Sequence, residues 1–207
     1  MNYDLHIHSK YSYDSFLAPE RIIKTAKKKG LDGVAITDHG TIRGGVETLK
    51  LNKDKNFKVI VGAEIKTEYG DVIGLFLNED IKTTTFVDVL DEIKSQGGLS
   101  VLAHPYRQYK FPEKIIDKVD LIEGFNARSR RKINEKAYKL GLKFKKPMTA
   151  GSDAHSFFEI GNGVVKIESV EDLMVQKADF NGKETNYYLS HGLSLFNERL
   201  KKIFSRY

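Results

Sequence analysis

Two short motifs in this sequence pair a histidine with another possible metal ligand two residues away. His6 and His8 form the first motif. Side chains at this spacing point to the same side of a β-strand, so both imidazoles could bind one ion. Asp153 and His155 repeat the spacing. Because imidazole combined with carboxylate suits zinc, manganese or iron better than magnesium or calcium, the motifs predict a transition-metal site.

Further residues of the same types raise the number of possible ligands beyond what one ion takes. They are His39, His104, Glu64, Asp14 and Asp38. A tetrahedral ion takes four ligands, so the full set fits two or three divalent ions. The chain has no cysteine, which excludes thiolate ligands, disulfides and a cysteine nucleophile. Either motif alone is more typical of ordinary surface or core histidines, so the prediction depends on where the whole set lies in the fold.

Short apolar runs alternate with amphipathic, lysine-rich stretches along the chain. This alternation predicts a parallel sheet covered by helices, either a compact (β/α) barrel or, as a second choice, an open doubly wound sheet. A tight turn is expected at 69–71. The expected strands are 3–8, 33–37, 59–66, 71–77, 99–103, 120–125, 147–150 and 163–167. The expected helices are 19–29, 43–51, 84–96, 112–118, 129–140, 170–177 and 191–204.

The candidate ligands fall at or just past the carboxyl ends of the expected strands. In a barrel these ends open onto one face, which is where active sites of barrel enzymes lie. Residues that are far apart in sequence would therefore converge there. The side chains in question are those of His6, His8, Asp38, His39, Glu64, His104, Asn126, Asp153 and His155.

The composition is that of an ordinary folded protein. The 207 residues are 40% hydrophobic and 30% charged, and 34 basic against 28 acidic residues give a net charge of +6. This length predicts one domain over residues 1–207, and the charge would attract phosphates without requiring a nucleic-acid partner. No stretch approaches the ~18 apolar residues of a membrane helix, and the first residues lack the basic and apolar parts of a signal peptide. We therefore expect a cytoplasmic protein with no membrane partner.

Six stretches of this sequence together resemble a known family, the PHP domain, named for polymerase and histidinol phosphatase. The resemblance implies a distorted (β/α)7 TIM-like barrel with a trinuclear metal site that hydrolyses phosphate esters. It is strongest to the stand-alone members described as metal-dependent phosphoesterases, and residues 166–207 would complete the domain. The stretches are DLHIHSKYSYDS (4–15), ITDHGTIRGG (36–45), VGAEIKTEYGDVIGLFL (61–77), GGLSVLAHPYR (97–107), IEGFNARS (122–129) and GSDAHSFFEIG (151–161).

The resemblance also implies how the ligands would be shared among the ions. Asn126 occupies a place where the family often has histidine or asparagine, and some members have histidine where this chain has Asp14. Asp38 would either bind an ion or orient the neighbouring imidazole. The first ion would be held by His6, His8, Glu64 and Asp153, the second by Glu64 and His104, and the third by Asp14, His39 and His155.

The expected reaction is attack on phosphorus by a hydroxide that forms between two ions bridged by Glu64. Asp153 and His155 are the other residues expected to act in catalysis. Arg107 and Arg128 follow two of the strand ends, where each could bind a phosphate or simply be a loop cation. The manganese, zinc or iron ions would supply the remaining positive charge.

Several functions remain open within this framework. The leading one is a phosphomonoesterase that acts on nucleotides or small phosphorylated metabolites. A 5′-to-3′ exonuclease on short single-stranded nucleic acid is the main variant, and Tyr11 and Tyr13 could stack on its bases. Two functions of different classes are a metal-dependent amidohydrolase and a non-catalytic PHP domain. His191, which lies away from any strand end, is expected to be structural.

Overall fold

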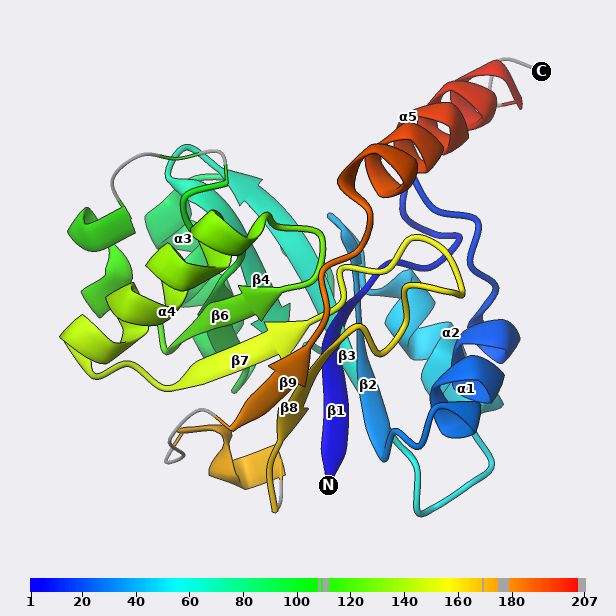
Figure 1. Cartoon of the computed structure of the whole chain (residues 1–207), viewed down its shortest axis with the longest axis horizontal. Coiled ribbons are helices and arrows are strands. Elements are labelled where there is room, and N and C mark those ends of the chain that lie inside the picture. The colour runs from blue at the N-terminus through cyan, green and yellow to red at the C-terminus, as the bar shows by residue number, and fades with distance from the viewer. Residues whose placement is uncertain (108, 110–111, 169, 175–178, 205–207) are drawn as a thin grey trace.

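A mixed β-sheet organises the fold, which the computed structural model describes for residues 1–107, 109, 112–168, 170–174 and 179–204 (Figure 1). The strands follow the order β7-β6-β5-β4-β3-β2-β1-β8-β9 across one sheet. Their bounds are β1 Asn2–Ile7, β2 Gly33–His39, β3 Lys58–Thr67, β4 Gly70–Leu75, β5 Leu99–Leu102, β6 Leu121–Asn126, β7 Met148–Gly151, β8 Gly163–Lys166 and β9 Phe180–Gly182.

The sheet curls until its ends nearly meet, which gives a single-domain α/β fold with an almost closed barrel. Ile7 at the end of β1 forms a parallel bridge with Ala154, just past β7. The His8 amide donates to the Ala154 carbonyl over 2.9 Å. Apolar side chains fill the interior, among them Tyr3, Leu5 and Ala150, which are all buried. The barrel predicted from the sequence is therefore confirmed.

The expectation of a parallel sheet is wrong at two strands. β4 runs antiparallel to both β3 and β5, and β8 is antiparallel to β1 and β9. The reason for β4 is the tight turn at its start, because a connection this short can only join antiparallel strands. The hydroxyl of Thr67 donates to the Gly70 carbonyl over 2.6 Å, and Gly70 takes a φ of 129° that suits glycine.

Four helices flank the sheet, α1 and α2 on one side and α3 and α4 on the other (Figure 1). α1 shows why these segments are helical. Pro19 occupies its first turn, where a missing N–H costs nothing, and Ile22 and Ala26 bury one face. The bounds are α1 Pro19–Lys28, α2 Arg43–Leu51, α3 Phe86–Ser95 and α4 Arg131–Phe144.

The predicted helix at 129–140 does not stop at Gly141. α4 continues to Phe144 and ends where Lys145 adopts a φ of 53°. Gly141 serves packing instead, because a Cβ there would lie 2.5 Å from the Met148 sulfur. The predicted helix at 112–118 is two 3-10 turns, and that at 170–177 is a 3-10 turn over Val170–Met174, with 175–177 outside the described residues.

The last helix, α5 (Tyr187–Phe204), lies beyond the carboxyl end of β1 (Figure 1). It starts four residues before the predicted helix at 191–204. Within the part of the chain that the structure describes, no helix is both long and apolar enough to cross a bilayer.

Candidate metal centre

The barrel brings five histidines together at the carboxyl ends of its strands. They come from β1 and the residue just past it, the end of β2, and the segments after β5 and β7. His8 lies between two other rings, tilted against His39 with 4.5 Å between ring centroids and stacked on His155 with 4.2 Å. The groups whose ligand atoms lie within 4.8 Å of one another are His8–Asp14–His39–His155, His6–His8–Glu64, His6–His104–Asp153 and Glu64–Asp71–His104.

The first of the predicted ion sites has its ligand atoms aimed at one point. The Nε2 atoms of His6 and His8 are 3.0 Å apart, and Glu64 Oε2 lies 3.3 and 3.2 Å from them. Asp153 Oδ1 is 3.7 and 3.4 Å from the same two nitrogens. Two imidazoles and two carboxylates that converge in a buried space are a donor set that fits a divalent transition metal.

Glu64 has its two carboxylate oxygens directed at different histidines. Oε2 faces His6 and His8, whereas Oε1 lies 2.8 Å from His104 Nε2. Asp71 adds a carboxylate oxygen 3.9 Å from that same His104 nitrogen. A carboxylate in this position could hold one ion with each oxygen, as the resemblance implied.

A loop between β1 and α1 supplies Asp14 to the third predicted group. Asp14 Oδ2 lies 2.7 Å from His155 Nε2 and 3.5 Å from His39 Nε2. The side chains of Asp14 and His155 are largely buried, while His39 is at the rim with 24% of its side chain exposed. The opening beside His39 would give a substrate access to this group.

Arg107 and Asn126 contact each other in the same cluster. The Asn126 amide oxygen accepts from the Arg107 guanidinium and from the Arg128 backbone N–H. Its amide nitrogen donates to Glu123 and to Asp153. Arg107 Nη1 donates to Asp153 Oδ2 over 2.7 Å. The assignment of Asn126 to an ion stays a prediction.

Arg128 is buried and links the cluster to α5. Its Nη1 lies 2.5 Å from His155 Nδ1, and its Nη2 donates to the Ser194 hydroxyl over 2.9 Å. The guanidinium is therefore held beside the centre, as a phosphate-binding group must be, and its role in substrate binding stays a prediction.

Two buried carboxylates of the cluster escaped the sequence reasoning. Glu123 Oε1 lies 2.9 Å from His6 Nδ1, which leaves His6 Nε2 free to bind an ion, and Glu123 Oε2 accepts from the His104 amide. The pairing of β6 with β7 shifts register between Glu123 and Phe125. Strict alternation would put Glu123 and Asn126 on opposite faces, so the shift explains why both reach the site. Asp71 lies in β4, whose antiparallel placement was not predicted.

Asp38 and Asp4 hold the backbone around the ligands and do not touch the imidazoles. Asp38 accepts hydrogen bonds from the backbone N–H and the hydroxyl of Ser9, directly after His8. Asp4 accepts from the amides of Ser152 and Gly161 over 2.8 and 2.7 Å. Burial raises the pKa of Asp4 to about 6, against the opposing effect of these hydrogen bonds.

Two of the candidate ligands sit in strained backbone conformations. His104 has a φ of 26° and Asp153 a φ of 54°. Non-glycine residues rarely adopt positive φ, which costs of order 1–3 kcal/mol and is concentrated at functional sites. The placement of these two side chains therefore lowers the stability of the fold.

The buried carboxylates and imidazoles shift one another's ionisation. Burial opposes the charged form of His8, but hydrogen bonds to Asp153 and Glu64 outweigh it and raise the pKa of His8 to about 9. Burial also favours a neutral Glu64, yet the charges of His6 and His39 hold the pKa of Glu64 well below its usual value. Without an ion, His6 and His8 therefore carry protons near neutral pH, whereas burial and the charges of His8 and Arg128 lower the pKa of His155 to about 4.

Metal binding should release protons and depend on pH. An imidazole must lose its proton to bind an ion, and the pKa of His8 is raised to about 9. We expect affinity to rise from neutral pH to about pH 9, with at least one proton released per chain at neutral pH. Calorimetric titration with Mn²⁺ in two buffers of different ionisation enthalpy measures this release. Binding without proton release would contradict the prediction.

A cavity of about 730 Å³ opens above the cluster. Its walls include Tyr13, Lys66 and Lys82, and one wall is formed by α5 through His191, Ser194, Leu195 and Glu198. His191, which was expected to be structural, thus borders the candidate site. The size is that of a small-molecule site.

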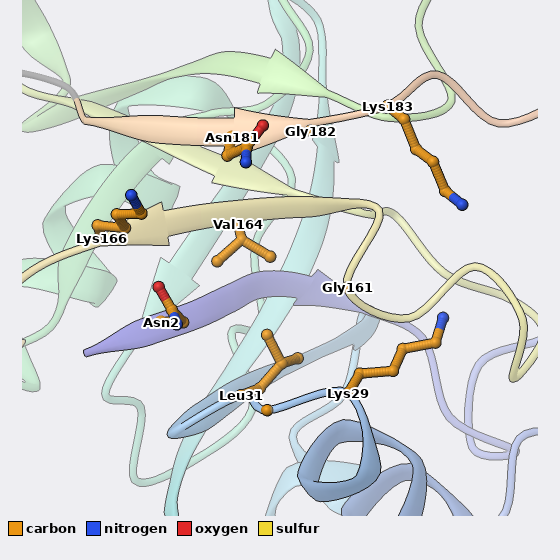
Figure 2. A pocket seen from close by; sticks show the side chains of 10 residues that line it. Asn2, Lys29, Leu31, Gly161, Val164, Lys166, Asn181, Gly182 and Lys183 are labelled. Atoms are coloured by element: carbon orange, nitrogen blue, oxygen red, sulfur yellow. The ribbon is translucent and has the colours of Figure 1, made fainter.

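A second hollow, of about 380 Å³, lies beside the amino-terminal part of β1 (Figure 2). Its lining includes three lysines, Lys29, Lys166 and Lys183. None of the candidate ligands belongs to its lining, so this hollow is separate from the metal cluster.

The chain is similar to other proteins over most of its length. It is 48% identical over 141 residues to an uncharacterized protein of Methanocaldococcus jannaschii. The matching region covers 61% of this chain and 82% of the relative. A second uncharacterized protein of that organism is 35% identical over 191 residues, or 86% of this chain and 74% of the relative.

One similar solved structure is a two-domain protein of Bacteroides vulgatus that contains a predicted PHP-like metal-dependent phosphoesterase. It matches with a TM-score of 0.72 at 20% sequence identity. The match covers 88% of this chain and 65% of that one. At this identity the match shows the fold, and this chain spans slightly less than two thirds of that protein.

The family model of the PHP domain matches residues 4–189. This range contains all the motifs that carried the resemblance, and it includes every candidate ligand and all of the barrel except the first residues of β1. The chain belongs to the PHP domain family.

Proposed function

We propose that this protein is a metal-dependent phosphoesterase that hydrolyses nucleotides or small phosphorylated metabolites. The observation that carries the proposal is the placement of Glu64, whose two oxygens face different histidines in a cavity that Arg107 and Arg128 also line. When bound, two or three manganese, zinc or iron ions supply an activated water and charge that polarises the phosphate. His6, His8, Glu64 and Asp153 would hold the first ion, Glu64 and His104 the second, and Asp14, His39 and His155 the third.

The arginines would bind the phosphate of the substrate. Arg107 and Arg128 lie on two sides of Asp153, with guanidinium nitrogens 2.7 and 3.9 Å from its carboxylate. A guanidinium binds phosphate oxygens in a bidentate manner and remains charged at any physiological pH. These two residues would therefore orient the phosphate and neutralise charge on its outer oxygens.

Two features of the cavity favour a small substrate with more than a bare phosphate. Lys66 and Lys82 add positive charge to the walls, and Ile81 and Leu195 add apolar surface. The cavity volume of about 730 Å³ suits a nucleotide or a sugar phosphate. A cytoplasmic location would supply such metabolites.

Phosphate release by manganese-reconstituted protein tests the proposal. The substrates would be nucleoside monophosphates, 3′,5′-bisphosphates, sugar phosphates and short 5′-phosphorylated oligonucleotides, with His8→Ala as the matched variant. We expect release that is lost in His8→Ala, although that variant stays folded by circular dichroism. Equal release by both proteins, or none by wild type with metal bound, would overturn the proposal.

A second candidate, an exonuclease on short single strands, is favoured by one side chain. Tyr13 stacks on His39 with 4.7 Å between ring centroids, and 54% of it is exposed at the mouth. An exposed ring beside a phosphate site could stack on a base. An activity that grows with oligonucleotide length and falls steeply with salt would favour the exonuclease over the monoesterase.

A further inference from the structure

Polar side chains of α5 contact the barrel. Three of its side chains form hydrogen bonds with the segments around the metal cluster. Ser194 accepts from Arg128, while Asn197 Nδ2 donates to the Asp14 carbonyl over 3.2 Å. Lys201 Nζ donates to the carbonyl of Lys10 over 2.6 Å and to that of Ser12. These contacts span α5 from its middle to its carboxyl end.

Two of these side chains hold one loop, residues 9–17, which carries Asp14. The ends of this loop meet, because the Lys10 amide donates to the Leu17 carbonyl over 2.7 Å. The ammonium of Lys201 lies against its backbone carbonyls and 5.0 Å from the centre of the Phe16 ring. A cation held by carbonyls and an aromatic ring fixes the loop from outside.

The third contact reaches the same metal group from the other side. Ser194 holds Arg128, and Arg128 Nη1 lies against His155 Nδ1. His155 and Asp14 are neighbours, with 2.7 Å between His155 Nε2 and Asp14 Oδ2. α5 is therefore linked to both members of this pair. It reaches Asp14 through Asn197, and it reaches His155 through Ser194 and Arg128.

We propose that α5 is a clamp that sets the affinity of the Asp14–His39–His155 group for its ion through Ser194, Asn197 and Lys201. These three are positioning residues, since they act through the loop 9–17 and Arg128. They lie beyond residue 189, where the match to the family model ends. The inference rests on the proposed metal centre, and it assigns to this C-terminal helix a function that the family match does not cover.

The test uses the full-length double variant Asn197→Ala, Lys201→Met. Arg199→Met is the matched control, because it removes an exposed cation from the same helix. Manganese bound per chain is measured by elemental analysis at limiting free metal, and amide hydrogen exchange follows residues 9–17. We expect one ion to bind about ten-fold more weakly or more, in the range seen when partners of ligands are removed, and the loop to exchange faster.

The two remaining ions should bind as in wild type, because His6, His8, Glu64 and His104 have no contact with Asn197 or Lys201 among the described hydrogen bonds. Metal affinity and loop exchange identical to those of Arg199→Met would overturn the clamp, as would a wild type that binds fewer than three ions. Normal metal binding by wild type without phosphate release would instead count against the proposed reaction alone.

Discussion

Glu64→Gln should abolish turnover and remove at least one bound ion. The amide keeps the shape of the side chain, but it loses the negative charge and replaces one ligand oxygen with an NH₂ group that cannot bind a cation. Glu64 lies against His6, His8, His39 and His104, and no other described carboxylate has ion-pair contacts with all four. Loss of a partner that only orients a ligand costs roughly 10–100-fold, and loss of a shared ligand should exceed this.

The measurement is kcat/KM for the best substrate of the panel, together with the manganese content of each protein. Glu79→Gln is the control, because it neutralises an exposed carboxylate. Wild-type metal content and turnover in Glu64→Gln would refute the shared-ligand role. A loss of activity with all ions retained would move the role of Glu64 from metal binding to the substrate.

Gly151→Ala should destabilise the protein and disturb the first ion site together. A Cβ at this position would lie 2.3 Å from His6 Cβ and 2.9 Å from Glu123 Oε1. Since β7 packs against β1 there, the backbone of one strand must move. Overpacking of this kind costs about 1–3 kcal/mol of the free energy of unfolding. The same movement displaces His6, so metal affinity should fall with stability.

Urea unfolding of the metal-free protein measures the loss of stability, and metal titration measures the loss of metal affinity. Gly192→Ala is the contrasting variant, because a Cβ there meets no atom within 4 Å in the helix α5. It should raise helix stability by up to about 1 kcal/mol. If Gly151→Ala were as stable as wild type with unchanged metal affinity, the close approach of β7 to β1 would be refuted.

The sequence was informative wherever chemistry coincided with a strand end. His6, His8, Glu64, His104 and Asp153 have ligand-type side chains at the carboxyl ends of apolar runs, and a barrel gathers such ends by its geometry. Convergence of these residues therefore followed from the order of strands and helices alone, without knowledge of any contact.

What escaped prediction depends on contacts between distant segments. Glu123 reaches the cluster because of a register shift between β6 and β7, and Asp71 because β4 is antiparallel. Gly141 resembles a helix stop, but it is required by the Met148 sulfur packed against it. His191 borders the cavity because α5 lies across the mouth. Local propensity contains no information on such tertiary contacts.

The position of β1 in the sheet has a consequence for how the protein is made. β1 positions the first histidine pair, yet one of its edges pairs with β8, and its end pairs with Ala154. The ribosome must therefore add more than 150 residues before that edge finds its partner. Until then β1 presents unpaired backbone groups, which invite association with other nascent chains. Asp153 and His155 also emerge late, so the candidate ligands of the proposed metal centre can come together only after most of the described barrel has been synthesised.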